Sequence, residues 1–284
     1  MSRRAFKAAA IREHPDGRAD FPMTRLELPD YDVVGIRASN PGPFTLTGTN
    51  SWIVGRDPAW LIDPGPALDE HLEALAGELQ ARGGLGGIAL THDHPDHAEA
   101  VPEIRRRFPD AALAAARGEP TLLLADGDTA GPLQALSTPG HAPDHLAFAL
   151  RRGGDELVFT GDAVLGEGSV FITPYPGALG AYLAALARLR EREIALIAPG
   201  HGPLVDDPAA KLDQYIAHRL ERERRLLAAL AAGRRTVDEL LDDAWSDAPA
   251  ALRPAAAATL AAHLDKLDEE GRLPEGVERP QFSL

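Results

Sequence analysis

The chain has 284 residues, of which 44% are hydrophobic and 25% are charged. This composition is typical of a globular protein and excludes collagen-like and disordered chains. The formal net charge of −14 argues against a general binder of long nucleic acids. Because the chain has no cysteine, it can have neither a disulfide nor a thiol nucleophile, and any transition metal must be held by His, Asp or Glu.

From the apolar runs in the sequence we expect neither a membrane span nor a secretion signal. No stretch of the chain reaches the roughly 18 apolar residues that a membrane-spanning helix needs. The apolar run at residues 8–11 is too short for the centre of a signal peptide. We therefore expect a cytoplasmic protein with a loose arm at residues 1–24 and with no membrane partner.

From residue 25 the pattern predicts strands that alternate with helices. Residues 51–55 and 59–63 predict a hairpin whose turn lies between Gly55 and Pro58. Apolar residues at helical spacing predict helices over 67–82, 97–108 and 178–192. Short apolar runs predict further strands at 88–90, 133–137, 146–150, 157–160 and 194–198. The mixture of hairpins and helices favours an α+β layout.

After Asp207 the pattern becomes almost entirely helical. A long helix is predicted over 208–232, and Thr236 with Glu239 has the spacing of a capping box that opens a helix over 237–245. A further helix over 250–270 and a ribbon over 272–284 complete the layout of a winged-helix module. We predict a catalytic domain at 1–232 and a winged-helix-like domain at 233–284.

The strongest signal is the segment Thr91-His-Asp-His-Pro-Asp-His97, which directly follows a predicted buried strand. His92 and His94 are two residues apart, so in an extended loop they face the same side. Neutral imidazoles and carboxylates are good ligands for Zn²⁺. Packing five ionisable groups at one strand end without a metal would add repulsion to desolvation. The segment therefore predicts a metal site.

Three further candidate ligands each follow a predicted strand. They are His141 in Thr138-Pro-Gly-His141, Asp162 in Thr160-Gly-Asp162 and His201 in Pro199-Gly-His201-Gly202. Taken singly, each is an ordinary turn residue. Together with the first segment they provide seven nitrogen and oxygen ligands, because loops at strand ends are where site residues gather.

This set of residues resembles the metallo-β-lactamase-fold hydrolases, whose hallmark is His-x-His-x-Asp-His followed by a single His, Asp and His. Residues 25–206 contain every position of that hallmark. The resemblance implies an αββα sandwich with a two-metal site at one edge. It implies one metal at His92, His94 and His141, a second metal at Asp96, His97 and His201, and Asp162 as the bridge.

Other segments are similar to the beta-lactamase-like protein 2 group, whose members are zinc-dependent hydrolases with a C-terminal winged helix. The segments are Asn40-Pro-Gly-Pro43, Gly48-Thr-Asn50, residues 159–168, His201-Gly-Pro203 and residues 211–219. The best-studied kind in this group is an endoribonuclease that acts on single-stranded RNA. The resemblance therefore implies the same reaction for this chain.

The chemistry that the residues allow is metal-assisted hydrolysis. Two Zn²⁺ ions that share a water lower its pKa to about 7, so that hydroxide forms at neutral pH and attacks a carbonyl or phosphorus centre. Mn²⁺ and Fe²⁺ also suit these ligands. Asp96 is the predicted catalytic residue, because its carboxylate can accept a proton or orient the nucleophile in addition to binding metal.

Four further residues are candidates for supporting roles. Asp63 either accepts a ring N–H from a ligand histidine or ends its strand as a turn residue before Pro64. His145 either contacts substrate or is structural. Thr91 and Thr138 are predicted to brace their loops through hydroxyl hydrogen bonds.

Several other histidines and arginines are predicted to have no role in the chemistry. His14, His71 and His263 lie on polar stretches, and a role for His218 has only weak support. The predicted long helix also contains arginines that alternate with Glu221 and Glu223, which predicts ion pairs on a solvated face and no RNA-binding patch. These arginines are Arg219, Arg222, Arg224 and Arg225.

Charge leaves two alternatives to the ribonuclease hypothesis. The −14 charge suits a small thioester, lactone or other acyl substrate, as in glyoxalase II-like hydrolases, better than long RNA. A non-catalytic nucleic-acid-binding regulator is the other alternative, but residues 233–284 carry six basic and eleven acidic residues, so we expect no duplex DNA partner. The expected substrate is a small molecule or a short single-stranded RNA, and the sequence leaves the oligomeric state open.

Overall fold

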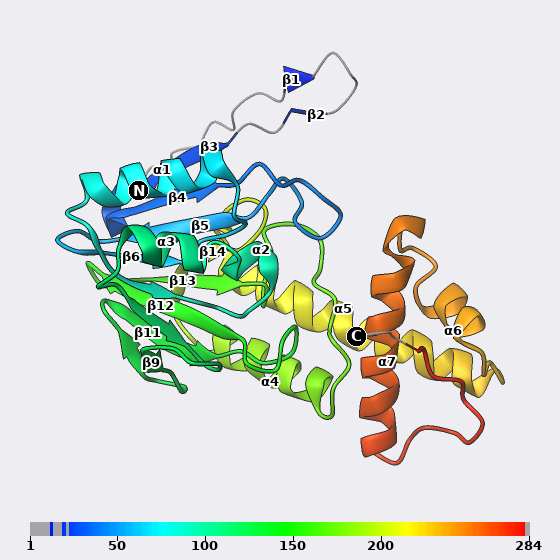
Figure 1. Cartoon of the computed structure of the whole chain (residues 1–284). Helices are drawn as coiled ribbons and strands as arrows, with labels where there is room; N and C mark the ends of the chain where they lie inside the picture. Colours follow the sequence, from blue (N-terminus) through cyan, green and yellow to red (C-terminus); the bar gives the residue numbers. More distant parts are fainter. Residues whose placement is uncertain (1–11, 14–18, 21–22, 282–284) are drawn as a thin grey trace.

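The computed structural model describes residues 12–13, 19–20 and 23–281, so most of the predicted arm at 1–24 lies outside the described residues. Two β-sheets pack face to face, and helices cover their outer sides (Figure 1). The first sheet has seven strands and the second has five, each in sequence order. This arrangement confirms the predicted αββα sandwich.

The strand bounds follow the predicted pattern closely. The first sheet contains β3 (Thr24–Leu28), β4 (Val33–Arg37), β5 (Asn50–Val54), β6 (Ala59–Ile62), β7 (Leu85–Ala89), β8 (Ala112–Ala115) and β9 (Leu122–Leu123). The second sheet contains β10 (Thr129–Ala130), β11 (Leu133–Ser137), β12 (Leu146–Arg152), β13 (Asp155–Gly161) and β14 (Ile194–Pro199). A separate pair, β1 (Arg12–Glu13) and β2 (Ala19–Asp20), precedes them. The predicted hairpin is the antiparallel pair β5 and β6.

Strand β5 shows how the sheets become buried on both faces. Trp52 and Val54 join the core between the two sheets, where Phe148 and Phe159 meet them from the second sheet. Ile53 points to the opposite side and joins the core beneath the outer helices. Since alternate side chains of a strand face opposite sides, a continuous apolar strand is stable only where both sides are covered.

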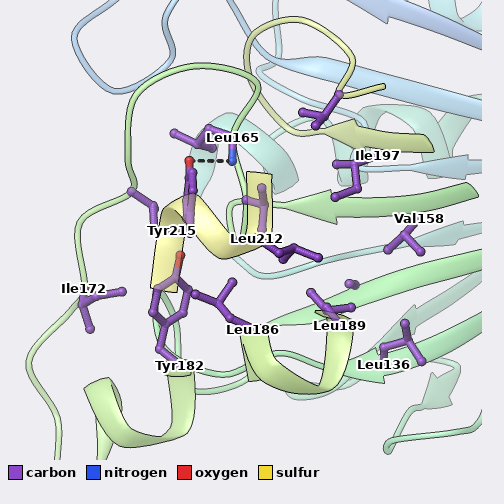
Figure 2. Packing of buried hydrophobic residues seen from close by; sticks show 14 of the residues in the cluster. Leu136, Val158, Leu165, Ile172, Tyr182, Leu186, Leu189, Ile197, Leu212 and Tyr215 are labelled. Atoms are coloured by element: carbon purple, nitrogen blue, oxygen red, sulfur yellow. Dashed lines mark hydrogen bonds between the residues drawn. The ribbon is translucent and has the colours of Figure 1, made fainter. Parts of the chain in front are cut away.

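Each sheet has its own helical cover. The first sheet is covered by α1 (Asp69–Ala81) and α3 (Val101–Arg107), which contribute Leu75 and Ile104 to the outer core. The second sheet is covered by α4 (Ala178–Arg190) and by the first half of α5 (Pro208–Ala231). Figure 2 shows this packing, with Leu186 and Leu212 of the helices against Val158 and Ile197 of the strands.

The strand directions bring the candidate site residues to one edge. Strands β13 and β14 are parallel, and β11 runs the same way because the antiparallel β12 lies between β11 and β13. In the first sheet β6 and β7 are also parallel. The loops that follow these strands carry the predicted ligands, so sheet topology gathers residues that lie far apart in the sequence.

The C-terminal region forms a fourth core of its own. It contains the second half of α5, α6 (Val237–Ala244), the short 3₁₀ turn η2 (Ala250–Leu252) and α7 (Arg253–Glu269). Helix α5 extends from the sandwich into this unit (Figure 1), with Leu212 in the second sheet's core and Leu226 in the C-terminal core. Thr236 and Glu239 form the predicted capping box. The domain boundary predicted at residue 232 falls at the end of this shared helix.

Two predicted elements are corrected by the structure. The helix predicted over 97–108 is divided into α2 (Pro95–Ala98) and α3, because Pro102 lacks the N–H that would continue the helix. The predicted ribbon over 272–284 forms no strand within its described residues, which end at Gln281. Pro274, Gly276 and Pro280 interrupt that segment, whose backbone bonds to the rest of the unit include Arg272 N–H to the Leu267 carbonyl at 2.7 Å and Glu278 N–H to the Arg235 carbonyl at 2.8 Å.

The prediction that the arginines of α5 lie on a solvated face is correct for two of them and wrong for the other two. Arg224 and Arg225 pair with Glu221 at 2.7 and 2.8 Å, as predicted. Arg219 and Arg222 are buried, with 2% and 6% exposure. These two residues face the sandwich and the C-terminal core, since α5 is covered by protein on more than one side. Within the described part of the chain, no helix is both long and apolar enough to cross a membrane.

The C-terminal core should respond to cavity formation. Leu260 is fully buried there, so Leu260→Ala is expected to lower the free energy of unfolding by about 2–5 kcal/mol. Leu220→Ala is the matched control, because Leu220 is 52% exposed on α5 and the change should cost under about 0.5 kcal/mol. Urea unfolding followed by circular dichroism measures both, and equal effects would contradict the packing described.

Candidate metal centre

The segment after β7 provides four of the seven predicted ligands. The chain leaves β7 at Ala89, and α2 begins at Pro95 with His94 as its N-cap residue. Asp96 and His97 then lie in the first turn of α2. The rings of His92 and His94 meet edge to face with their centroids 4.5 Å apart. An extended loop followed by a single helical turn therefore aims all four side chains at the same region.

Three imidazoles from two loops form the first group. The Nδ1 atom of His94 lies 3.0 Å from Nε2 of His92 and 2.9 Å from Nε2 of His141. One nitrogen from each ring lies within 4.8 Å of the others. These three residues are those to which the family resemblance assigns one metal.

The second group joins α2 to the loop after β14. Nε2 of His201 lies 3.2 Å from Nε2 of His97 and 3.2 Å from Oδ2 of Asp96. Gly200 allows this approach, because a Cβ there would stand 2.7 Å from the His97 ring and 2.9 Å from Oδ1 of Asp162. The Asn50 side chain holds the same loop by donating to the carbonyls of Pro199 and Gly202.

Asp162 lies between the two groups. Its Oδ1 is 3.4 Å from Nε2 of His97 and 3.3 Å from Nε2 of His201, while its Oδ2 is 3.5 Å from Nε2 of His141. Oδ1 is buried and has no hydrogen-bond partner among the described residues. A buried carboxylate oxygen left without a donor is costly unless a cation neutralises it.

The outer nitrogens of the rings show which nitrogens face inward. Nδ1 of His97 donates to Asp63 at 2.8 Å, Nδ1 of His141 donates to the Phe171 carbonyl at 3.1 Å, and Nδ1 of His201 donates to the Gly48 carbonyl at 3.3 Å. Since a carbonyl or carboxylate oxygen only accepts, each Nδ1 carries a proton, and in the neutral form of the ring its Nε2 presents a lone pair to the centre. Lone pairs that converge at about 3 Å without protons fit a cation between them.

Burial controls the charge of the rings. It lowers the pKa of His92 well below its ordinary value and lowers the pKa of His141 to about 4. Burial would raise the pKa of Asp162, but His201 and His97 outweigh this and hold it well below its usual range. Burial would likewise lower the pKa of His97, but Asp162 and Asp63 raise it well above its ordinary value. At neutral pH these directions leave His92 and His141 neutral and keep a proton on His97, which a divalent ion binding at that ring would displace.

Asp63 braces the first segment from the end of β6. Its Oδ1 accepts from the Thr91 N–H at 2.8 Å, and its Oδ2 accepts from the Thr91 hydroxyl at 2.7 Å and from the His97 ring at 2.8 Å. The Thr91 hydroxyl in turn accepts from Nδ1 of His92 at 2.9 Å. Asp63 is 2% exposed, so one buried carboxylate orients two predicted ligands.

His145 and Thr138 brace Asp162 in a similar way. Nε2 of His145 accepts from the Asp162 N–H at 3.1 Å, so its Nδ1 carries the proton and donates to the Thr138 hydroxyl at 2.8 Å. His145 is 1% exposed. His145 and Thr138 therefore form a buried chain of hydrogen bonds that ends at the backbone N–H of Asp162.

The supporting contacts that the sequence analysis missed come chiefly from backbone atoms. The carbonyls of Gly48 and Phe171 orient His201 and His141, and no sequence pattern marks a carbonyl. His71, predicted to lie on a polar stretch, is 1% exposed, and its ring contacts the Ser51 hydroxyl at 3.0 Å. His263 is also fully buried, whereas His14 lies outside the described residues.

Comparisons with known proteins agree with this geometry. The model of the metallo-beta-lactamase superfamily matches residues 44–123 and 114–201, and the model of the beta-lactamase associated winged helix domain matches residues 236–276. The chain therefore belongs to the metallo-beta-lactamase superfamily and carries a C-terminal winged-helix domain. The beta-lactamase-like protein 2 homolog of Caenorhabditis elegans is 31% identical over 88% of this chain and 87% of the relative.

Other relatives differ in their names. Lactamase-like protein adaB of Aspergillus niger is 33% identical over 94% of this chain and 90% of the relative. The atrochrysone carboxyl ACP thioesterase of Aspergillus chevalieri is 34% identical over 73% of this chain and 70% of the relative. A metallo-beta-lactamase family protein from Thermus thermophilus has a solved structure that matches with a TM-score of 0.68 at 25% identity, over 84% of this chain and 94% of that chain.

Metal content tests the centre directly. Protein loaded with Zn²⁺ is expected to hold about two metal ions per chain, and His94→Ala about one, because the first group loses its shared nitrogen. Elemental analysis after desalting measures both, and prolonged chelation should remove all metal. A wild-type chain that keeps no Zn²⁺, Mn²⁺ or Fe²⁺ would contradict the centre.

Asp63 should affect metal affinity without being a ligand. Asp63→Asn removes the acceptor of the His97 ring, so the metal dissociation constant is expected to rise about 10–100-fold. Competition with a chromophoric chelator measures the change. Asp69→Asn, at an exposed carboxylate in the first turn of α1, is the matched control and should bind metal as the wild type does. Equal affinity in both variants would refute the role assigned to Asp63.

Proposed function

We propose that this metallo-beta-lactamase-fold hydrolase is a two-zinc enzyme that cleaves acyl thioesters. The observation that carries the proposal is the convergence of two His/Asp groups on one buried carboxylate, Asp162. His92, His94 and His141 would hold one ion, and Asp96, His97 and His201 the other. When bound, two divalent ions supply Lewis acidity and lower the pKa of water to about 7.

The chain's own residues complete the reaction. Asp96 is 28% exposed in its side chain, and Asp96 and His94 are the two ligand candidates that are partly exposed. Burial would raise its pKa, but its hydrogen bond to His201 and the charge of His97 keep the pKa below its ordinary value. Its ionised carboxylate can therefore orient the attacking water and accept a proton. Hydrolysis adds water across the acyl C–S bond, and the proton passes to the departing thiolate.

The surroundings of the centre favour an acyl substrate over a polyanion. Arg117 lies between two carboxylates, 3.6 Å from Asp93 and 3.6 Å from Asp144, so its charge is already compensated. Phe44 is 52% exposed, and its ring lies 5.6 Å from that of Phe171. Phe171 in turn lies 4.9 Å from the His141 ring, which puts an aromatic pair beside the centre. An apolar acyl group fits such a wall.

The relatives support the same choice. The Aspergillus chevalieri relative is named a thioesterase and shares 34% identity with this chain. Cleavage of single-stranded RNA is the second candidate, supported by the similarity to the beta-lactamase-like protein 2 homolog. Both candidates use the same metal chemistry, so their difference lies in what the surrounding walls accept.

We also propose that the protein acts in the cytoplasm on a small substrate and binds neither duplex DNA nor membranes. The net charge of −14 supports the proposed absence of a duplex DNA partner, since a duplex-binding winged helix needs a basic recognition surface. The ion pairs of the C-terminal unit support it as well. Arg253 pairs with Asp238 and Asp242, which leaves less free positive charge for phosphates.

A substrate panel on protein of verified metal content tests the proposal. Acyl thioesters with aromatic and short aliphatic acyl groups should be hydrolysed at about 1–10³ s⁻¹, the usual range of enzymes, whereas a labelled single-stranded RNA should stay intact. The Asp162→Ala variant, purified identically, controls for contaminating activity and should be inactive. RNA cleavage without thioester turnover would select the second candidate, and turnover of neither would overturn both.

A further inference from the structure

The loop of residues 163–177, which links β13 to α4, fixes the ligand candidate His141 from two sides. The Phe171 carbonyl accepts from Nδ1 of His141 at 3.1 Å. The Thr173 hydroxyl donates to the His141 carbonyl at 2.6 Å. Both the ring and the backbone of His141 therefore depend on the position of this loop.

The C-terminal helices hold this loop in place. Thr259 of α7 is 2% exposed, and its hydroxyl accepts from the Ile172 N–H at 3.3 Å and donates to the Ala255 carbonyl at 3.1 Å. The Ile172 N–H directly follows the Phe171 carbonyl along the chain. Three further hydrogen bonds join the loop to α5 and α7. The Tyr215 hydroxyl accepts from the Leu165 N–H, as Figure 2 shows. Nζ of Lys211 donates to the Gly166 carbonyl, and the Glu269 carboxylate accepts from the Gly177 N–H.

Arg219 of α5 is a buried charged residue that contacts the same loop. Its guanidinium donates to the Val170 carbonyl and lies over the Tyr182 ring, 5.5 Å from the ring centroid. Its Nε has no hydrogen-bond partner, and among residues 23–281 Arg219 forms no ion pair. Burying an arginine without a carboxylate is costly, so its contacts to the Val170 carbonyl and the Tyr182 ring must offset that cost.

Tyr182, whose ring Arg219 covers, packs next to two of the ligand candidates, His141 and Asp162. A Cβ at Gly140, which precedes His141 and has a φ of +145°, would stand 2.5 Å from Cβ of Tyr182. The Tyr182 hydroxyl donates to the Ala163 carbonyl at 2.7 Å, next to Asp162. The phenol beneath Arg219 thus packs against the neighbours of two ligand candidates.

We propose that Arg219 of α5 and Thr259 of α7 are positioning residues for the ligand candidate His141. This inference rests on the proposed function of the metal centre and assigns the winged-helix domain a part in it. Thr259 of that domain and Arg219 of α5 hold loop 163–177, and the loop sets the direction of the His141 lone pair. That role needs no basic surface, which agrees with six basic and eleven acidic residues in 233–284.

Two pairs of variants test the inference through metal binding, without relying on activity. Thr259→Val removes the hydroxyl, whereas Thr259→Ser keeps it. Arg219→Met removes the buried charge, and Arg222→Met is its matched control. Arg222 lies on the same helix and is 6% exposed, but it donates to Ala244 and Asp247 inside the C-terminal unit.

The readouts are zinc per chain, zinc dissociation constants from chelator competition, and the thermal midpoint. Thr259→Val and Arg219→Met should weaken one of the two zinc sites about 10–100-fold and leave the other unchanged, because His141 belongs to one group. Thr259→Ser should bind zinc within about threefold of the wild type. Arg222→Met should lower the thermal midpoint and keep both zinc affinities.

Each outcome either supports or overturns the positioning role of Arg219 and Thr259. Unchanged zinc affinities in Thr259→Val, or an equal loss in Arg222→Met, would overturn the positioning role and leave the proposed function standing. Absence of zinc binding in the wild type would overturn the proposed function and the inference with it. If Arg219→Met does not fold, the comparison of Thr259→Val with Thr259→Ser decides alone.

Discussion

Five imidazoles and two carboxylates converge in a largely buried space at one edge of the sandwich, and the surrounding structure depends on how that charge is balanced. The inward nitrogens of His94 and His141 are 2.9 Å apart, and those of His97 and His201 are 3.2 Å apart. Groups this close repel one another unless protons or cations lie between them. The outward protons are engaged by carbonyls and by Asp63, so the balance on the inward side comes from the proton that His97 retains or from cations that displace it.

The local sequence predicted the ligand candidates and named Asp63, Thr91 and Thr138 as supports, but it did not predict which ligand candidate each support contacts. His92, His94, Asp96 and His97 follow a buried strand in one short segment, so their convergence depends only on a loop and one helical turn. The partners of Asp63 could not be predicted from one short segment. Its contacts to Thr91 and His97 require β6 and β7 to pair in one register. The carbonyls that orient the rings carry no sequence signal at all.

The long helix α5 shows why the remaining errors occurred. Arginines that alternate with glutamates predict a solvated face, and Arg224 and Arg225 fit that prediction. Arg219 does not, because the same helix packs on the second sheet at one end and on α6 and α7 at the other (Figure 1). Which face of a helix is covered depends on two cores that are remote in sequence. Composition alone could not separate the buried arginines from the exposed ones.

Anomalous diffraction from crystals of zinc-loaded protein, recorded on both sides of the zinc absorption edge, tests the central claim most directly. We expect two anomalous peaks at this edge of the sandwich, one among His92, His94 and His141 and the other among Asp96, His97 and His201. Crystals that diffract well but show no peak within bonding distance of these side chains would contradict the account.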